Sequence, residues 1–257
     1  MEAKGLFRGV YFFAALVIFR DLFLKEAIIL AGGKGTRLIS VTGGGQKVVV
    51  KVGSKTFLEI LLEQLDSCQF DKVYLALGHC AEEVQLVISK LNLRLKLTTI
   101  CEVTPLGTGG AIKNALKHVC SNNVLVLNGD SLNDINYANL LLMHKKSEAD
   151  ISVLTKFVSN IARYGEIKTN LKGQIISFHE KTGEQLSGII NTGAYVIPKN
   201  LFISQILCKF SFEEFLTENV DQLNICALES EGNFIDIGTP DDYQKFVLEM
   251  SRNNVYK

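Results

Sequence analysis

Short apolar runs alternate with amphipathic segments along the first half of the chain. The runs AIIL, KVYLAL, LKLTTI and VLVLN are rich in valine, leucine and isoleucine, which indicates buried strands. Between them, TFLEILLEQL, AEEVQLVISKL and GGAIKNALKHV carry apolar residues at the spacing of one helix face. Alternating strands and helices predict a parallel sheet with crossover helices.

The pattern changes after the predicted helix ANLLLMHKK. ISVLTKFV, GEIKT, QIISFHE and IINTGAYVI follow one another as strands, with turn residues such as LKGQ between them. We therefore expect the second half either to extend the sheet or to form a smaller β-rich lobe. Helices are expected at residues 201–207 and 212–218, then strands NICALE and FIDI, and a last helix, PDDYQKFVLEM, that starts at Pro240.

One domain is the simplest division of the 257 residues, because no linker or repeat interrupts the pattern. We assign residues 25–257 to that domain and residues 1–24 to an apolar extension. The run GVYFFAALVIF in the extension resembles the middle of a signal peptide, but it is shorter than the ~20 apolar residues that span a bilayer. A mis-assigned start codon, an extra packed helix and, with least support, membrane attachment all fit it.

The charge of the chain is balanced, with 27 basic and 27 acidic side chains, so it favours neither nucleic acid nor an anionic membrane as a partner. A small-molecule partner is the better expectation. The six cysteines form no CxxC or cysteine–histidine metal pattern, and we interpret them as buried thiols in a reducing, cytoplasmic compartment.

The stretch LAGGKGTRL places three glycines, a lysine and an arginine directly after the first predicted strand. It is not a Walker A loop, because Lys34 is followed by Gly35 rather than by serine or threonine. It is not a dinucleotide fingerprint either, because Leu38 stands where that motif has its third glycine. Such a turn can aim backbone N–H groups at an anion, with Arg37 adding a charged fork, although an ordinary glycine-rich turn also fits the segment alone.

A series of motifs follows this stretch in a fixed order: ICEVTPLGTGGAI, VLNGD, RYGEI, FHEK, NTGAY and FIDIGTPDDY. Together with GGKGTRL they resemble the sugar-phosphate nucleotidyltransferases, and among these most closely the heptose 1-phosphate guanylyltransferases. The resemblance implies a Rossmann-like α/β fold with a mixed, mostly parallel central sheet and a small β-rich sugar-binding lobe. It also implies transfer of a nucleotidyl group from a nucleoside triphosphate to a sugar 1-phosphate, with release of pyrophosphate. Self-association is common in the family and is left open.

The resemblance implies a role for each matching position. Three positively charged side chains are expected in the reaction itself: Arg37, Lys47 and Lys181. Nucleotide contacts are expected at Leu30, Gly32, Gly33, Gly35, Thr36, Glu102, Gly107 and Gly109. Contacts to the sugar phosphate are expected at Gly165, Glu180, Lys181, Asn191 and Gly193. A Mg²⁺ ion is expected on Asp130 and Asp236.

The two aspartates also carry a signal of their own. Each follows an apolar strand, where an open α/β sheet forms its ligand crevice, and carboxylate oxygens suit a hard Mg²⁺ ion. A turn aspartate that caps its own backbone is the alternative for either residue taken alone. Their occurrence beside the glycine turn favours the metal.

Glu102 matches the position at which family members hold the base. A carboxylate only accepts hydrogen bonds, and guanine presents adjacent N–H donors, so GTP is the expected nucleotide. Some uridylyltransferases also carry glutamate here, and a surface glutamate before a turn is a further alternative. A uridylyltransferase and a mannose 1-phosphate guanylyltransferase therefore stay open. The Glu180–Lys181 pair, taken alone, also fits a solvated pair at a strand end.

One segment departs from the family pattern. The family has a Pro-Lys-Pro sequence around the lysine that meets the nucleotide phosphates, whereas Lys47 stands between Gln46 and Val48 after three glycines. Glycines add backbone freedom that prolines remove, so we expect this loop to be mobile until substrate binds. A non-catalytic nucleotide or sugar-phosphate sensor is the rival interpretation that follows.

Overall fold

The computed structural model describes residues 24–33, 35–179, 183, 185–202 and 205–252, with side chains up to residue 250. Nearly all of the apolar extension and the Glu180–Lys181 pair lie outside the described residues. No helix in the described part of the chain combines the length and the hydropathy needed to cross a membrane.

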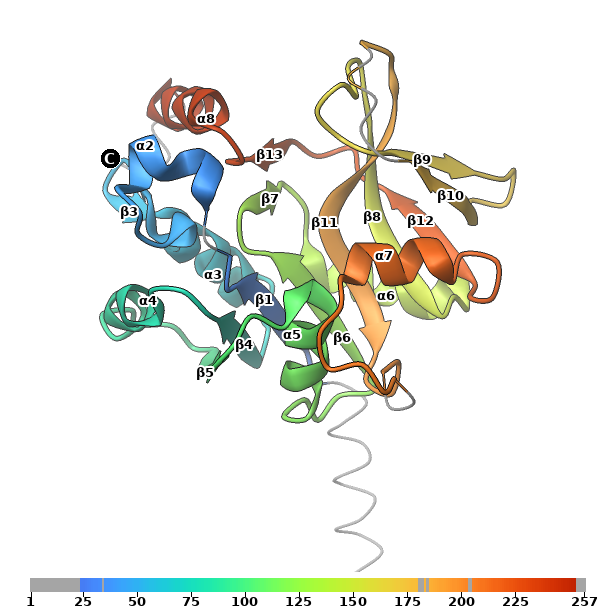
Figure 1. Cartoon of the computed structure of the whole chain (residues 1–257), viewed down its shortest axis with the longest axis horizontal. Coiled ribbons are helices and arrows are strands. Elements are labelled where there is room, and N and C mark those ends of the chain that lie inside the picture. The colour runs from blue at the N-terminus through green and yellow to red at the C-terminus, as the bar shows by residue number, and fades with distance from the viewer. Residues whose placement is uncertain (1–23, 34, 180–182, 184, 203–204, 253–257) are drawn as a thin grey trace, which may run out of the picture.

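The first half of the chain builds the predicted parallel sheet (Figure 1). Its strands lie in the order β6-β1-β4-β5, and each neighbouring pair is parallel. The strands are β1 (Glu26–Ala31), β4 (Lys72–Leu77), β5 (Lys96–Cys101) and β6 (Asn123–Asn128). The connecting helices are α3 (Phe57–Ser67), α4 (Ala81–Ile88) and α5 (Gly107–Leu116). Each of these strands and helices was expected from the apolar spacing.

The second half extends the same sheet through one long strand, β11 (Gly188–Pro198). Residues 194–198 of β11 pair antiparallel with β6, while its first residues pair antiparallel with two other strands, β8 and β9. The added strands are β8 (Ile151–Val158), β9 (Glu166–Thr169), β10 (Ile175–His179) and β12 (Ile225–Glu229). Of the two alternatives for this half, extension of the sheet is therefore the observed one, and the expected α/β class with a mixed central sheet is confirmed.

Short elements that the sequence did not predict surround the carboxyl ends of the parallel strands. They include two-stranded ribbons, turns of 3-10 helix and one short α-helix. They are η1 (Thr36–Leu38), α2 (Ile39–Thr42), η2 (Lys47–Val49), β2 (Lys51–Val52), β3 (Lys55–Thr56) and β7 (Ser131–Asn133). Strand β13 (Phe234–Asp236) was expected from the run FIDI, and its pairing with β7 was not.

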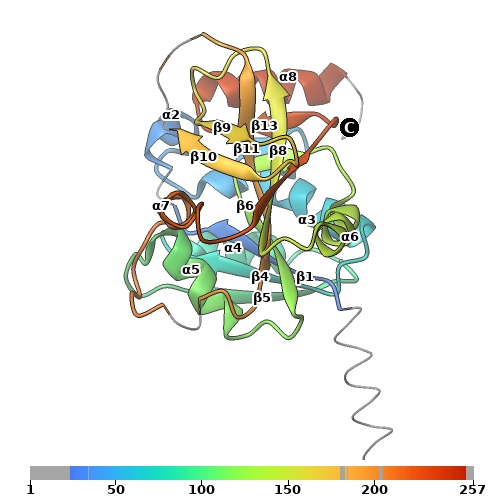
Figure 2. The same cartoon turned by 90° about the vertical axis from the view of Figure 1, so that its right-hand side faces the viewer.

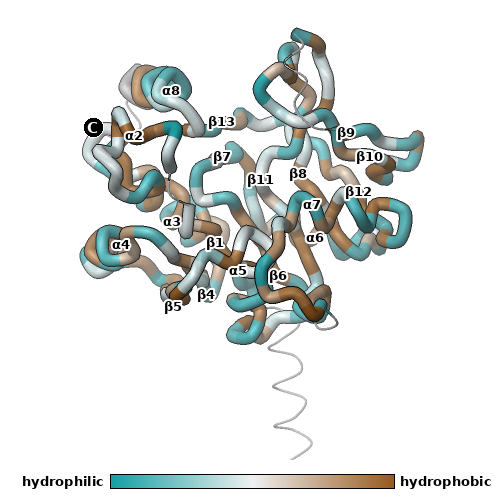
Figure 3. Tube along the Cα trace, viewed as in Figure 1, coloured by the Kyte–Doolittle hydropathy of each residue, from teal (hydrophilic) through white to brown (hydrophobic). Residues whose placement is uncertain are grey.

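Helices cover both faces of the sheet (Figure 2). One face packs on α3 and on α6 (Tyr137–Ser147), and the other on α5 and on α7 (Phe212–Glu218). Alternate residues of β1 serve the two faces, because Ala27 and Ile29 belong to one apolar cluster and Ile28 to the other. The last helix, α8 (Pro240–Arg252), closes a third cluster with the β2–β3 ribbon. Brown stretches in the central strands of Figure 3 mark the apolar residues of this layered core.

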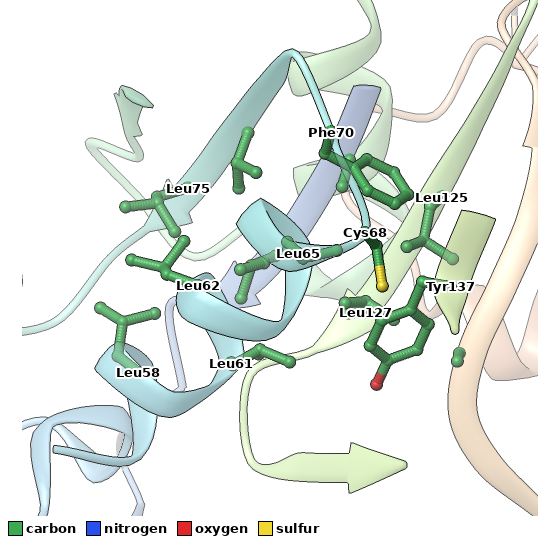
Figure 4. Packing of buried hydrophobic residues seen from close by; sticks show 14 of the residues in the cluster. Leu58, Leu61, Leu62, Leu65, Cys68, Phe70, Leu75, Leu125, Leu127 and Tyr137 are labelled. Atoms are coloured by element: carbon green, nitrogen blue, oxygen red, sulfur yellow. The ribbon is translucent and has the colours of Figure 1, made fainter. Parts of the chain in front are cut away.

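Helix α3 shows why the pattern specifies the packing (Figure 4). Its buried leucines point toward strands β1, β4 and β6. Thr56 and Glu59 form a capping box that fixes the helix start, with the Thr56 hydroxyl accepting from the Glu59 N–H at 3.2 Å. The leucines on this face are Leu58, Leu61, Leu62 and Leu65.

The prediction of a helix at residues 201–207 is wrong for the part of this segment that the structure describes. Residues 201–202 form a turn, and residues 205–207 have no regular structure. Phe202 is buried against the rings of Phe210, Phe212 and Phe215, whereas the Ile206 side chain is 93% exposed. Phe202 packs into the core and Ile206 does not, so the described residues of this segment lack the buried face of an amphipathic helix.

Candidate active site

A cavity of about 980 Å³ opens at the carboxyl ends of β1, β4 and β6. This is the edge at which open α/β sheets bind their ligands. It brings together most of the nucleotide-side residues that the sequence singled out. They are Leu30, Gly32, Gly33, Gly35, Thr36, Arg37, Lys47, Glu102, Gly107 and Asp130.

The glycine turn lies directly against Lys47. Gly35 has a positive φ of 57°, and a Cβ atom there would lie 3.1 Å from Lys47 Cβ. A side chain at this position would therefore be strained and would press on the lysine. The turn runs into η1, which carries Arg37 in the cavity wall.

Lys47 and Asp130 form an ion pair across the cavity, with Lys47 Nζ 2.6 Å from Asp130 Oδ2. The lysine side chain is 11% exposed and the aspartate side chain 36% exposed. Asp130 follows β6, and Lys47 begins η2, so residues far apart in sequence meet at the sheet edge.

Asp236 lies beside this pair. The β7–β13 ribbon sets Asp236 opposite Ser131, and the Ile237 N–H donates to Asp130 O at 3.0 Å. Burial raises the pKa of the Asp236 carboxyl, the Asp130 carboxylate raises it further, and Lys47 opposes the shift. Among the described residues, Asp236 Oδ1 is buried and has no hydrogen-bond partner.

These features fit a divalent cation. Two neighbouring carboxylates, one with a buried oxygen that lacks a partner, supply hard oxygen ligands of the kind that Mg²⁺ prefers. Within the described residues, no group of three or more acidic, histidine or cysteine side chains gathers around one point. Mg²⁺ usually takes one or two carboxylates together with substrate phosphates and water, so two aspartates suffice.

Glu102 lies at the opposite end of the cavity wall, after β5. Its Oε2 accepts the Leu106 N–H at 3.1 Å, and burial raises the pKa of its carboxyl. The bond to Leu106 fixes the orientation of the side chain. Gly107 forms the next part of the wall with a positive φ of 74°.

Gly109 lies behind the wall rather than in it. Its N–H donates to Phe210 O at 3.0 Å, and a Cβ atom at this position would lie 2.2 Å from Phe210 Cε2. Gly109 does not line the cavity. Close packing of the 208–210 segment on α5 therefore explains this glycine without a ligand.

The expected sugar-side residues that the structure describes, Gly165, Asn191 and Gly193, do not line this cavity. Gly165 packs against His179 O, and Gly193 packs against the Asn128 side chain with a positive φ of 76°. Asn191 donates to the Tyr195 hydroxyl at 2.7 Å. Glu180 and Lys181 lie outside the described residues, so their predicted roles stay predictions.

Several cavity residues were missed by the sequence reasoning. Glu213, on α7, reaches the cavity from a distant part of the chain, and its Oε2 accepts from Thr108 Oγ1 at 2.6 Å and from Ser211 Oγ at 2.9 Å. No motif marks Glu213, because the surrounding FSFEEFL segment reads only as a capped helix start. The other cavity residues missed in this way include Gln46, His79, Thr108 and Asn128.

An open α/β sheet with a cavity at the carboxyl ends of its parallel strands is the arrangement of many nucleotide-binding enzymes. A family model described as nucleotidyl transferase matches residues 26–252. The chain belongs to this family, which confirms the resemblance carried by the sequence motifs.

Individual relatives show which nucleotidyltransferases the chain is similar to. The chain is 39% identical over 224 residues to the D-glycero-alpha-D-manno-heptose 1-phosphate guanylyltransferase of Campylobacter jejuni, covering 87% of this chain and 99% of that protein. It is 35% identical to the enzyme of the same name from Aneurinibacillus thermoaerophilus, covering 88% of this chain and 98% of that protein. The crystal structure of HddC from Yersinia pseudotuberculosis complexed with GMP-PN superposes with a TM-score of 0.80 at 34% identity, covering 88% of this chain and 100% of that chain.

Proposed function

We propose that the protein transfers GMP from GTP to a heptose 1-phosphate, giving GDP-heptose and pyrophosphate for the synthesis of surface polysaccharide. The single observation that carries the chemistry is the cluster of Lys47, Asp130 and Asp236 at the edge of the sheet. Support for the substrates comes from the two guanylyltransferases that resemble this chain over nearly their full length.

The reaction needs an oxygen of the sugar phosphate to attack the α-phosphorus of GTP in line with the leaving pyrophosphate. The protein's task is to hold two anions together and to neutralise their charge, since no covalent nucleophile is required. Arg37 and Lys47 would bind the triphosphate, with the glycine turn donating backbone N–H groups. Mg²⁺ on Asp130 and Asp236, when bound, would neutralise charge on the phosphates.

Glu102 would select the base. With Oε2 held by the Leu106 N–H, its carboxylate is oriented to accept further hydrogen bonds, and guanine offers adjacent N–H donors. Adenine lacks that pair of donors, which favours GTP over ATP. UTP remains the alternative nucleotide and mannose 1-phosphate the alternative acceptor.

Lys181 and Glu180 would bind the phosphate and hydroxyl groups of the acceptor, with Gly165, Asn191 and Gly193 nearby in the second half of the sheet. This assignment rests on the motifs FHEK, RYGEI and NTGAY. A cytoplasmic location agrees with six free cysteines and with the supply of GTP. The prediction that these thiols are buried is wrong for Cys101, Cys120 and Cys208, which are exposed.

The non-catalytic sensor is less well supported. A sensor needs to bind nucleotide but has no use for a carboxylate whose pKa is raised by burial and by a second carboxylate, because that pair opposes binding of an anion without metal. The Lys47–Asp130 ion pair and Asp236 together favour catalysis.

A substrate panel tests the proposal. Purified protein with Mg²⁺ is mixed with GTP, UTP, CTP, ATP or dTTP and with heptose, mannose or glucose 1-phosphate, and pyrophosphate release is measured. We expect release with GTP and heptose 1-phosphate at a rate at least about tenfold above every other pair, the selectivity that about 1.4 kcal/mol gives. Binding of GTP without pyrophosphate release from any pair would favour the sensor instead.

A further inference from the structure

Gln46 is the residue before Lys47 and is almost fully buried, with 2% of its surface exposed. Its side-chain Nε2 donates to two backbone carbonyls, Ala31 O at 2.8 Å and His79 O at 2.6 Å. Ala31 ends β1, and His79 follows β4, so one amide group joins the ends of two neighbouring parallel strands. A polar side chain this deeply buried has both of its N–H donors paired, as burial requires.

The backbone of Gln46 adds a third bond. Its N–H donates to Glu83 Oε2, on α4, at 2.7 Å. Gly45 makes this approach feasible, because a Cβ atom there would lie 2.8 Å from Glu83 Oε2. The three bonds tie Gln46 to β4, α4 and the end of β1, directly after the glycines from which a mobile loop is expected.

The position of Gln46 determines where the side chain of Lys47 points. Gln46 has φ −68° and ψ 127°, and the chain turns directly into η2, which begins at Lys47. From there the Lys47 side chain reaches Asp130 across the cavity at 2.6 Å. A shift of Gln46 would therefore move the Lys47 backbone, and with it the charge that faces the triphosphate.

We propose that Gln46 is a positioning residue, which holds Lys47 in the cavity by bridging the ends of β1 and β4. The inference rests on the proposed function, because it assigns Lys47 to the triphosphate. Proline at position 46 would suit φ −68° but would lose all three hydrogen bonds. Gln46→Pro therefore removes the three hydrogen bonds of Gln46 while it keeps the backbone φ angle.

Gln64 provides a matched control. Its Nε2 also donates to two backbone carbonyls, Asn133 O at 2.7 Å and Ile135 O at 2.9 Å, but Gln64 does not line the cavity. Gln46→Ala and Gln64→Ala therefore remove the same kind of bridge from two places. A merely structural role for Gln46 predicts that both variants lose thermal stability and neither loses much activity.

The experiment measures kcat and KM for GTP by pyrophosphate release, together with melting temperature. We expect Gln46→Ala and Gln46→Pro to lower kcat/KM by roughly 10- to 100-fold, the scale of a misplacement of up to 1 Å, and Gln64→Ala to stay within about twofold. The same change is then made on a Lys47→Met background. If Gln46 acts through Lys47, Gln46→Ala costs nothing further there.

Equal activity of Gln46→Ala and Gln64→Ala would overturn the inference, and so would losses that multiply independently in the double variant. Full activity of Gln46→Pro would show that conformation alone suffices and would also overturn it. Absence of turnover in the wild-type protein would overturn the proposed function instead. The inference would then be judged by calorimetric GTP affinity, with the same order of variants expected, and it fails if that affinity is unchanged or absent.

Discussion

Gly238 lies directly against the carboxylate of Asp236, so an added methyl group there perturbs the predicted metal ligand without removing it. A Cβ atom at position 238 would lie 2.8 Å from Asp236 Oδ1 and 3.2 Å from Oδ2. Ordinary contact begins near 3.4 Å, so the nearer oxygen must retreat by about 0.6 Å. The backbone at Gly238 has no positive φ, and Gly238→Ala introduces no backbone strain.

The displacement sets the expected loss. A catalytic group displaced by 1 Å costs about 100-fold in rate, so a shift of about 0.6 Å predicts a fall in kcat of roughly tenfold. The concentration of Mg²⁺ that gives half-maximal rate should rise at the same time, because the two carboxylates no longer face one ion as well. The overpacking costs on the order of 1 kcal/mol, which lowers the melting temperature by about 2–4 °C.

The assay is pyrophosphate release at saturating GTP and sugar 1-phosphate over a Mg²⁺ titration. Gly188→Ala is the matched control, since a Cβ atom there meets only side-chain atoms outside the cavity, Ile161 Cγ2 at 3.2 Å and Glu166 Oε1 at 3.5 Å. The control should keep kcat within about twofold, the ordinary result for a tolerated change away from the site. Wild-type kcat and Mg²⁺ dependence in Gly238→Ala would refute the metal role of Asp236.

Three further predictions follow from the charges of the site. Lys47→Met should lower kcat/KM for GTP by about 100-fold or more, as loss of one charge-stabilising group does, measured by steady-state kinetics. Glu102→Gln, which adds a donor beside an acceptor, should reduce the preference for GTP over ATP by about tenfold in competition assays. Burial and Asp130 raise the pKa of Asp236, so this carboxyl stabilises the fold at low pH and loses that contribution as pH rises through its folded pKa. Asp236→Asn should therefore raise the melting temperature of the metal-free protein at pH 8 but not at pH 4, as calorimetry would show.

Strands and helices with a local sequence pattern were predictable, whereas pairings between distant segments were not. The strands β1, β4, β5 and β6 were predictable because each is a short apolar run, and α3 because its leucines recur on one face and a capping box starts it. The β7–β13 ribbon was not predictable as a pair, because its partners are a hundred residues apart and only three residues long. Yet this ribbon brings Asp236 beside Asp130.

The candidate site likewise contains residues that sequence motifs predict and residues that no motif marks. The glycine turn, Glu102 and both aspartates were predictable because each occurs at the end of a strand that the sequence predicts, and Lys47 because of its place in the motif order. Glu213 and Gln46 have no such signal: one enters the cavity from α7, and the other differs from the proline of the family pattern. The three glycines before Gln46 predict a mobile loop, and no local pattern predicts the bonds of Gln46 to two distant carbonyls and to Glu83.

We propose that Asp130 and Asp236, two carboxylates at the edge of the sheet, couple a metal ion to nucleotidyl transfer. The most direct measurement is pyrophosphate release from GTP and heptose 1-phosphate by the wild-type protein and by Asp130→Asn, with and without Mg²⁺. We expect release by the wild-type protein only when Mg²⁺ is present, and at least about a 100-fold slower rate for a folded Asp130→Asn variant. Metal-independent release, or an Asp130→Asn variant as fast as the wild type, would contradict it.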